Sequence, residues 1–158
     1  MEPRITQLPK TFLIGQRIEM SLANNKTSEL WQLFMPNRSQ IKNTVGSALY
    51  SVDIFPSTDF FQQYDPTRTF EKWAAVAVNN LDTIPDGMDS LSIPEGQYAV
   101  FHYVGKPSEA QPFMQYIFNQ WLPNSPYELD DRPHLAIMGD KYKGEYPDSE
   151  EDLWIPIC

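Results

Sequence analysis

The chain contains two similar short stretches, Leu33-Phe34-Met35-Pro36-Asn37 and Gln120-Trp121-Leu122-Pro123-Asn124. Each copy closes a segment whose aromatic and apolar residues recur at helical spacing. Because a proline inside a helix removes a backbone hydrogen bond, a break or a new turn is expected at each proline. The two stretches therefore predict two equivalent helices, one in each half of the chain.

Extended apolar segments surround the two predicted helices in the same order. The expected strands cover residues 11–22, 47–55, 70–78, 90–104 (interrupted at Pro94-Glu95-Gly96), 132–138 and 153–157. Residues 56–68 are expected to form a loop, and residues 79–88 the joint between the halves. The pattern predicts an α+β fold of duplicated βαββ units, with pseudo-repeats over about 1–80 and 81–158 and a mostly antiparallel sheet. A ligand cleft is expected between the two helices.

Composition limits the classes of function. A chain of 158 residues suits one domain (1–158), and 41% apolar with 13% aromatic residues indicates a globular protein. No stretch is as long as a membrane span, and the lone Cys158 forms no internal disulfide, so a cytoplasmic location is expected. The net charge of −9 argues against direct nucleic-acid binding. The acid-rich residues 127–152 are either a solvated face or a field that attracts cations.

Three stretches carry a family resemblance: Ile93-Pro94-Glu95-Gly96-Gln97-Tyr98-Ala99-Val100-Phe101, Trp121-Leu122-Pro123-Asn124-Ser125 and Ser149-Glu150-Glu151-Asp152-Leu153-Trp154-Ile155-Pro156-Ile157. With Trp31 and residues 84–88, they resemble signatures of the GyrI-like small-molecule-binding domain, which is also the effector-binding part of some AraC-type transcription regulators. The resemblance spans essentially the whole chain. It implies a stand-alone effector-binding domain whose central cleft receives hydrophobic, often cationic, drug-like molecules.

The resemblance also implies two glutamates that this chain lacks. Members commonly carry them at the positions that align with Ala77 and Ala136. A buried carboxylate is the usual partner of a lipophilic cation, because an unpaired charge is unfavourable in an apolar pocket. The loss of both glutamates weakens the expectation of cation selectivity, and leaves Glu151 or Asp152 as the acid nearest the cleft.

The candidate ligand-binding residues are aromatic, apolar or acidic side chains near the expected cleft: Trp31, Met35, Tyr50, Trp73, Phe113, Tyr116, Glu151, Asp152 and Trp154. Asp152 and Trp154 share one face of a strand, an acid and an aromatic ring that together suit a cation. Each candidate has a structural alternative. Trp154 is equally a core tryptophan, Asp152 a solvated strand end, and the helical stripes mostly core.

Catalytic patterns are weak in this sequence. His102 and His134 are isolated strand histidines, and no nucleophile elbow, P-loop or dinucleotide fingerprint occurs, so neither a metal site nor a cofactor is expected. The leading hypothesis is non-catalytic binding of a hydrophobic or cationic small molecule, for sensing, sequestration or transcription regulation. The alternatives are a hydrolase of strained-ring natural products and an acidic protein-binding inhibitor of a DNA-handling enzyme such as gyrase.

Overall fold

The computed structural model describes residues 2–62 and 65–158, so Gln63 and Tyr64 of the expected loop lie outside the described residues. Eight strands form one sheet and are β1 (Arg4–Leu8), β2 (Thr11–Met20), β3 (Leu49–Ile54), β4 (Phe70–Val78), β5 (Asp89–Ile93), β6 (Gly96–Val104), β7 (His134–Met138) and β8 (Glu150–Pro156). Every strand pair that the structure describes is antiparallel. The predicted α+β class with a mostly antiparallel sheet is confirmed.

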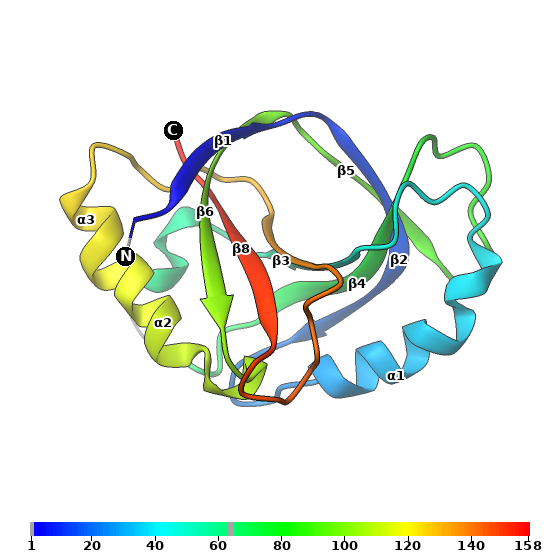
Figure 1. Cartoon of the computed structure of the whole chain (residues 1–158), viewed down its shortest axis with the longest axis horizontal. Helices are drawn as coiled ribbons and strands as arrows, with labels where there is room; N and C mark the ends of the chain where they lie inside the picture. Colours follow the sequence, from blue (N-terminus) through cyan, green and yellow to red (C-terminus); the bar gives the residue numbers. More distant parts are fainter. Residues whose placement is uncertain (1, 63–64) are drawn as a thin grey trace.

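Two helical segments lie on opposite sides of the molecule (Figure 1). The first is α1 (Thr27–Asn37), followed by the 3₁₀ helix η1 (Arg38–Gln40). The second starts with the 3₁₀ helix η3 (Pro107–Glu109) and contains α2 (Gln111–Tyr116), the π-helical turn η4 (Ile117–Trp121) and α3 (Leu122–Asn124). A further 3₁₀ helix, η2 (Thr58–Phe61), lies in the loop before β4.

Both helical segments end one residue beyond their proline, at Asn37 and Asn124. The expected break at Pro36 is therefore late by one residue, because a proline in the last turn disturbs few helical hydrogen bonds. Each asparagine side chain then donates to a carbonyl four residues back, Asn37 to Leu33 O at 3.0 Å and Asn124 to Gln120 O at 2.7 Å. The repeated stretch thus forms the same helix end twice.

Ser108 and Gln111 have the spacing of a capping box at the start of the second helix, but no side-chain cap hydrogen bond forms there. The backbone N–H and the hydroxyl of Ser108 donate instead to the carboxylate of Glu145, at 3.0 and 2.7 Å. Glu145 belongs to the β7–β8 loop, which crosses between the two helices in Figure 1. A carboxylate distant in sequence therefore replaces the local cap.

The strand order shows the duplication directly. The order is β1-β6-β8-β7-β3-β4-β2-β5, and its reversal exchanges each strand of the first half with its counterpart in the second. Each repeat is a ββαββ unit, with one more strand than the expected βαββ. In the first repeat the additional strand is β1, which was not among the expected strands. Each half lends its first strand to the other half, because β1 pairs with β6 and β5 pairs with β2. The pseudo-twofold axis passes between β3 and β7, at the pair formed by Ser51 and Ala136.

The sheet is curled, and its concave side is filled by the largest core cluster. Leu8 of one edge strand and Ile93 of the other belong to this cluster, so the two edges approach each other. Leu13, Val52 and Tyr98, which come from three further strands, are also fully buried in it. The helices pack on the opposite, convex face, α1 over the first half and α2 with η4 over the second.

Candidate functional site

Four of the expected site residues lie on the concave face, away from the helices. Tyr50, Trp73 and Trp154 pack in or against the concave cluster, and Trp73 is only 2% exposed. Burial raises the pKa of the Tyr50 hydroxyl. Trp73 donates its indole N–H to Glu71 at 2.9 Å, whereas the buried indole nitrogen of Trp154 has no hydrogen-bond partner among the described residues. Trp73 is thus buried in the concave core, and Trp154 packs against that core.

Asp152 is the fourth residue on the concave face, at its solvent edge. Its carboxylate is 2.9 Å from Nδ1 of His102 and 3.4 Å from Arg4, and Glu150 lies 2.7 Å from the other ring nitrogen of His102. Hydrogen bonds that the imidazole donates to Asp152 and then to Glu150 raise the pKa of His102 above its ordinary value. His102 is half exposed, so this is a surface ion cluster whose contribution to stability is small.

The other five expected residues lie on the helix-bearing face. Trp31 and Met35 belong to α1, and Phe113 and Tyr116 belong to α2. Glu151 lies opposite Tyr103 in the β6–β8 ladder, and Tyr103 packs under α2. The nine expected residues are therefore divided between the two sheet faces, and five of them lie on the face that carries the helices.

The sheet surface between the two helices is called the inter-helix strip here, and it centres on the pseudo-twofold axis. Its described residues are Ser51, Asp53, Lys72, Ala136, Met138 and Glu151. Ala136, one of the positions where relatives commonly carry a glutamate, lies at the axis itself. Ala77, the other position, lies on the concave face. The two alanines therefore do not face one common space.

Charged residues occupy equivalent positions on the two sides of the axis. Lys72 precedes Ala74, the neighbour of Ser51, by two residues, and Glu151 precedes Leu153, the neighbour of Ala136, by two residues. The Lys72 ammonium is paired with Asp53 at 3.0 Å, and this ammonium-bearing side chain is only 14% exposed. The duplicated fold thus carries a cation in one repeat and a carboxylate at the same place in the other.

Glu151 is the carboxylate on this strip that lacks an ion pair. Burial raises the pKa of Glu151, and the charge of Lys72 lowers it only in part. Within the described residues, no cationic group lies within ion-pair distance of it. The charge of Glu151 also raises the pKa of Tyr142, secondary to the burial of that hydroxyl, so the β7–β8 loop lies near this carboxylate.

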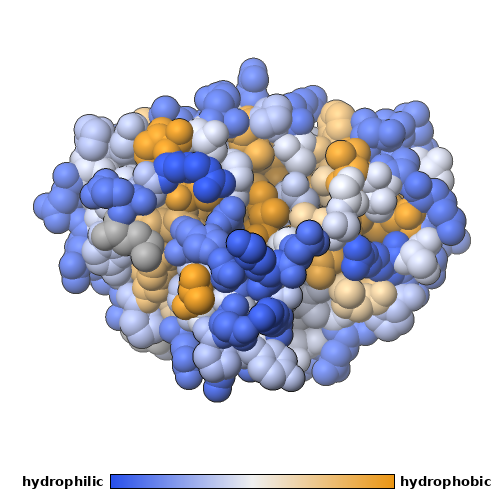
Figure 2. Space-filling model, viewed as in Figure 1, coloured by the Kyte–Doolittle hydropathy of each residue, from blue (hydrophilic) through white to orange (hydrophobic). Residues whose placement is uncertain are grey.

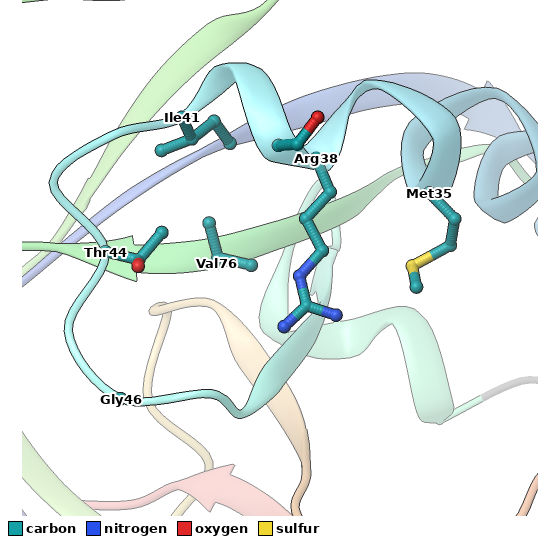
Figure 3. A pocket seen from close by; sticks show the side chains of 7 residues that line it. Met35, Arg38, Ile41, Thr44, Gly46 and Val76 are labelled. Carbon is teal, nitrogen blue, oxygen red and sulfur yellow. The ribbon is translucent and has the colours of Figure 1, made fainter.

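Two cavities are described on this structure, one near the end of each helical segment. The first has a volume of about 340 Å³ and is lined by Met35, Arg38, Ser39, Ile41, Thr44, Gly46 and Val76. Figure 3 shows the Arg38 side chain extending between Met35 and the segment that contains Gly46. Met35 is the one expected site residue that lines either cavity. A cleft over the strip itself stays a prediction.

The second cavity is the larger, at about 820 Å³, and lies between η2 and the end of the second helical segment. Phe61 and Phe118 line it, and their rings are stacked with centroids 3.8 Å apart. Behind them His134 is buried among aromatic rings. Sequence reasoning did not select Phe61 or His134 as site residues, and the only available signal was Phe60-Phe61 within an otherwise polar loop.

The molecular face seen in Figure 2 is mainly hydrophilic, with hydrophobic areas between the polar residues near its middle. No helix among the described residues is long and apolar enough to cross a membrane. A duplicated, curled antiparallel sheet with two helices on its convex face is the architecture of a GyrI-like effector-binding domain. The chain belongs to the family of integron-associated effector binding proteins, whose model matches residues 4–157.

Solved structures share this fold at low sequence identity. The structure of SAV2435 bound to tetraphenylphosphonium has a TM-score of 0.74 and 17% identity, and the match covers 100% of this chain and 94% of that one. The integron cassette protein VCH_CASS2 of Vibrio cholerae gives a TM-score of 0.69 at 14% identity, over 99% of this chain and 96% of that one. A search of curated protein sequences gave no match.

Two further structures show how widely the fold is used. EcmrR, in a complex with DNA, gives a TM-score of 0.73 at 14% identity, and the match covers 99% of this chain but 57% of EcmrR. A hydrolase encoded by lin2189 of Listeria innocua gives 0.62 at 14% identity, over 99% of this chain and 92% of that one. Since all these identities are low, the likeness establishes the fold and not a ligand.

Proposed function

We propose that this protein binds a small hydrophobic cation, without catalysis, on the inter-helix strip between its two repeats. The ligand would contact Glu151 at the floor and aromatic and apolar side chains of the two helices, among them Trp31, Met35, Phe113 and Tyr116. As a member of an effector-binding family, the protein would sense or sequester this compound. A cytoplasmic location stays a prediction from the lone Cys158.

The observation that carries this proposal is the unpaired, largely buried carboxyl of Glu151. Removing a carboxylate from water is unfavourable unless an opposite charge or hydrogen bonds compensate. Lys72 does not compensate fully, since it is engaged with Asp53. A lipophilic cation would supply the missing charge together with apolar surface, worth about 25 cal/mol per Å² removed from water. SAV2435, which shares the fold, is bound to tetraphenylphosphonium in its structure.

The test compares Glu151→Gln with Asp152→Asn by titration calorimetry, with tetraphenylphosphonium as the ligand. The two residues are adjacent in β8 but face opposite sides of the sheet, which makes Asp152→Asn a matched control for charge removal. We expect Glu151→Gln to weaken binding about tenfold or more, because a partly buried ion pair contributes well over 1 kcal/mol. Asp152→Asn should change the affinity less than about twofold.

Binding should also strengthen as pH rises through the raised pKa of Glu151, because only the ionised carboxylate attracts a cation. That pH dependence should disappear in Glu151→Gln. An equal loss of affinity in Glu151→Gln and Asp152→Asn would mean that the ligand binds at another surface. A broad panel of lipophilic cations that neither bind nor raise the melting temperature would contradict the proposal itself.

The hydrolase alternative stays a prediction, with Glu151 as the unpaired carboxyl on the strip. General acid–base catalysis needs a carboxyl placed at the reacting bond, and the axis position carries Ala136. The alternative of a protein-binding inhibitor rests on the acidic residues 127–152 and stays a prediction. Salt-sensitive co-purification of a DNA-handling enzyme would support it.

A further inference from the structure

Phe61 is inserted into a group of aromatic rings that come from both halves of the chain. Its ring stacks on Phe118 of η4 at 3.8 Å with an interplanar angle of 4°, and meets Phe55 edge-on at 4.8 Å. The ring of His134 lies 5.7 Å away. Phe55, Phe118 and His134 therefore surround one ring-sized place, which we call the aromatic box. Phe61, carried by a single 3₁₀ turn, occupies it.

His134 brings an unused polar atom to the aromatic box. Burial lowers the pKa of His134 to about 3, so the imidazole is neutral near neutral pH. Its Nδ1 is buried and has no hydrogen-bond partner among the described residues. An unsatisfied buried polar atom is unfavourable, and such atoms in folded proteins call for a specific explanation. In the tautomer that carries its proton on Nε2, the neutral imidazole accepts one N–H at Nδ1.

The surroundings of the aromatic box allow Phe61 to leave. Phe61 and Phe118 line the cavity of about 820 Å³, so the displaced ring has space beside it. Phe118 belongs to the π-helical turn η4, where the regular helical hydrogen-bond pattern is interrupted. Such turns are frequent at functional sites because they allow local rearrangement.

We propose that Phe61 is an internal substitute for a ligand, and that the aromatic box takes a planar aromatic molecule that carries an N–H donor. The guest ring replaces Phe61 against Phe118 and Phe55, and its N–H donates to Nδ1 of His134. Phe61 competes with the guest for the same place. The apparent affinity of the intact protein is therefore the affinity of the open box multiplied by the fraction of molecules in which Phe61 has left it.

This inference does not rest on the proposed function. The aromatic box uses Phe55, Phe61, Phe118 and His134. Of these, His134 lies opposite Asp53 at the end of the inter-helix strip, whereas Glu151 is on β8 and contributes nothing to the box. The box can therefore be occupied whether or not a cation binds at Glu151. A variant at Glu151 distinguishes the failure of one proposal from the failure of the other.

The experiment is a fluorescence titration with two planar dyes, DAPI, which carries indole and amidinium N–H groups, and thioflavin T, which has no N–H donor. We expect Phe61→Ala to bind DAPI about tenfold more tightly than the unmodified protein. The stack of Phe61 on Phe118, which competes with the guest ring, is absent from this variant, and such a stack contributes about 1 kcal/mol. Phe61→Leu keeps apolar volume in the box and should give a smaller gain. In Phe61→Ala/His134→Phe the preference for DAPI over thioflavin T should disappear.

Two controls separate displacement from loosening of the loop. Phe60→Ala removes the neighbouring ring of η2, which packs with Met20 and Phe70 and meets Phe55 at 4.6 Å and Phe61 at 5.2 Å. Because this variant leaves Phe61 in the box, it should raise DAPI affinity much less than Phe61→Ala does. The gain from Phe61→Ala should be the same when it is measured against Glu151→Gln alone, a background in which DAPI bound as a cation at the strip no longer contributes. Unchanged or weaker DAPI binding in both Phe61 variants, or an equal gain in Phe60→Ala, would overturn the proposal. Circular dichroism confirms that each variant is folded.

Discussion

His134 is the residue whose protonation the fold changes most clearly. Its ring is enclosed by Phe55, Phe61 and Phe118, with centroid distances of 4.8 to 5.9 Å. Desolvation lowers the pKa from 6.5 to about 3, so the folded protein keeps the ring neutral where the unfolded chain protonates it. Glu151 is shifted in the opposite sense, because burial favours the neutral acid. Burial thus favours the uncharged form at both positions.

This makes stability depend on pH in a defined direction. Between about pH 3 and pH 6.5 the unfolded chain binds more protons than the folded protein at His134, so the free energy of unfolding rises with pH there. The slope is at most about 1.4 kcal/mol per pH unit. We expect His134→Phe to flatten this rise. Urea unfolding at about pH 5 and about pH 7 measures it, and an unchanged slope would contradict a buried neutral histidine.

At the scale of the elements, β2 and β4 approach each other more closely at one point than a side chain permits. Gly15 lies opposite Ala75, and a Cβ added at Gly15 would be 2.0 Å from the carbonyl oxygen of Ala74. The equivalent position in β6 carries Val100, so the two repeats differ here. The glycine is required by the approach of the neighbouring backbone, since its φ is not in the left-handed region.

Gly15→Ala should therefore destabilise the protein by about 3 kcal/mol, because the strand pair must separate to accept the methyl group. Gly139→Ala is the matched control, since a Cβ there meets no atom within 4 Å. It should change the free energy of unfolding by less than about 0.5 kcal/mol. Chemical denaturation monitored by tryptophan fluorescence compares the two. Similar stability of both variants would contradict the close approach.

At the scale of the whole molecule, the exchange of first strands joins the two repeats into one sheet. β1 extends the second half through β6, and β5 extends the first half through β2. The concave core then collects side chains from both edges, including Leu8 and Ile93. Neither half can bury its part of this core without the other. We therefore expect the molecule to unfold as one unit.

Leu8 tests this closure of the curled sheet. Leu8 is 7% exposed within the concave core, whereas Ile5 on the same strand is 37% exposed. We expect Leu8→Ala to lower the free energy of unfolding by about 2–4 kcal/mol. Ile5→Ala should lower it by less than about 1 kcal/mol. Differential scanning calorimetry of both variants gives the comparison. Equal losses of stability would mean that β1 contributes backbone pairing to the sheet but no side chain to the concave core.

The duplication, the two helices, most of the strands and the family could be predicted from residue order, because alternation and helical spacing are local properties. Tyr50 and Val52 alternate with Ser51 and Asp53 in the sequence, and the structure places the two pairs on opposite faces of β3. β1 was not predicted, because its five residues are mostly polar and the alternation of apolar and polar side chains along them is short.

Residue order could not show which strand faces meet, because that depends on the curl of the sheet and on pairing between distant segments. The curl buries Trp73 and packs Trp154 against the concave core, and leaves Glu151 on the opposite face beside the pseudo-twofold axis. It also brings Phe61 of one repeat against Phe118 and His134 of the other. Local pattern therefore determined the elements, whereas long-range packing selected the side chains that share a site.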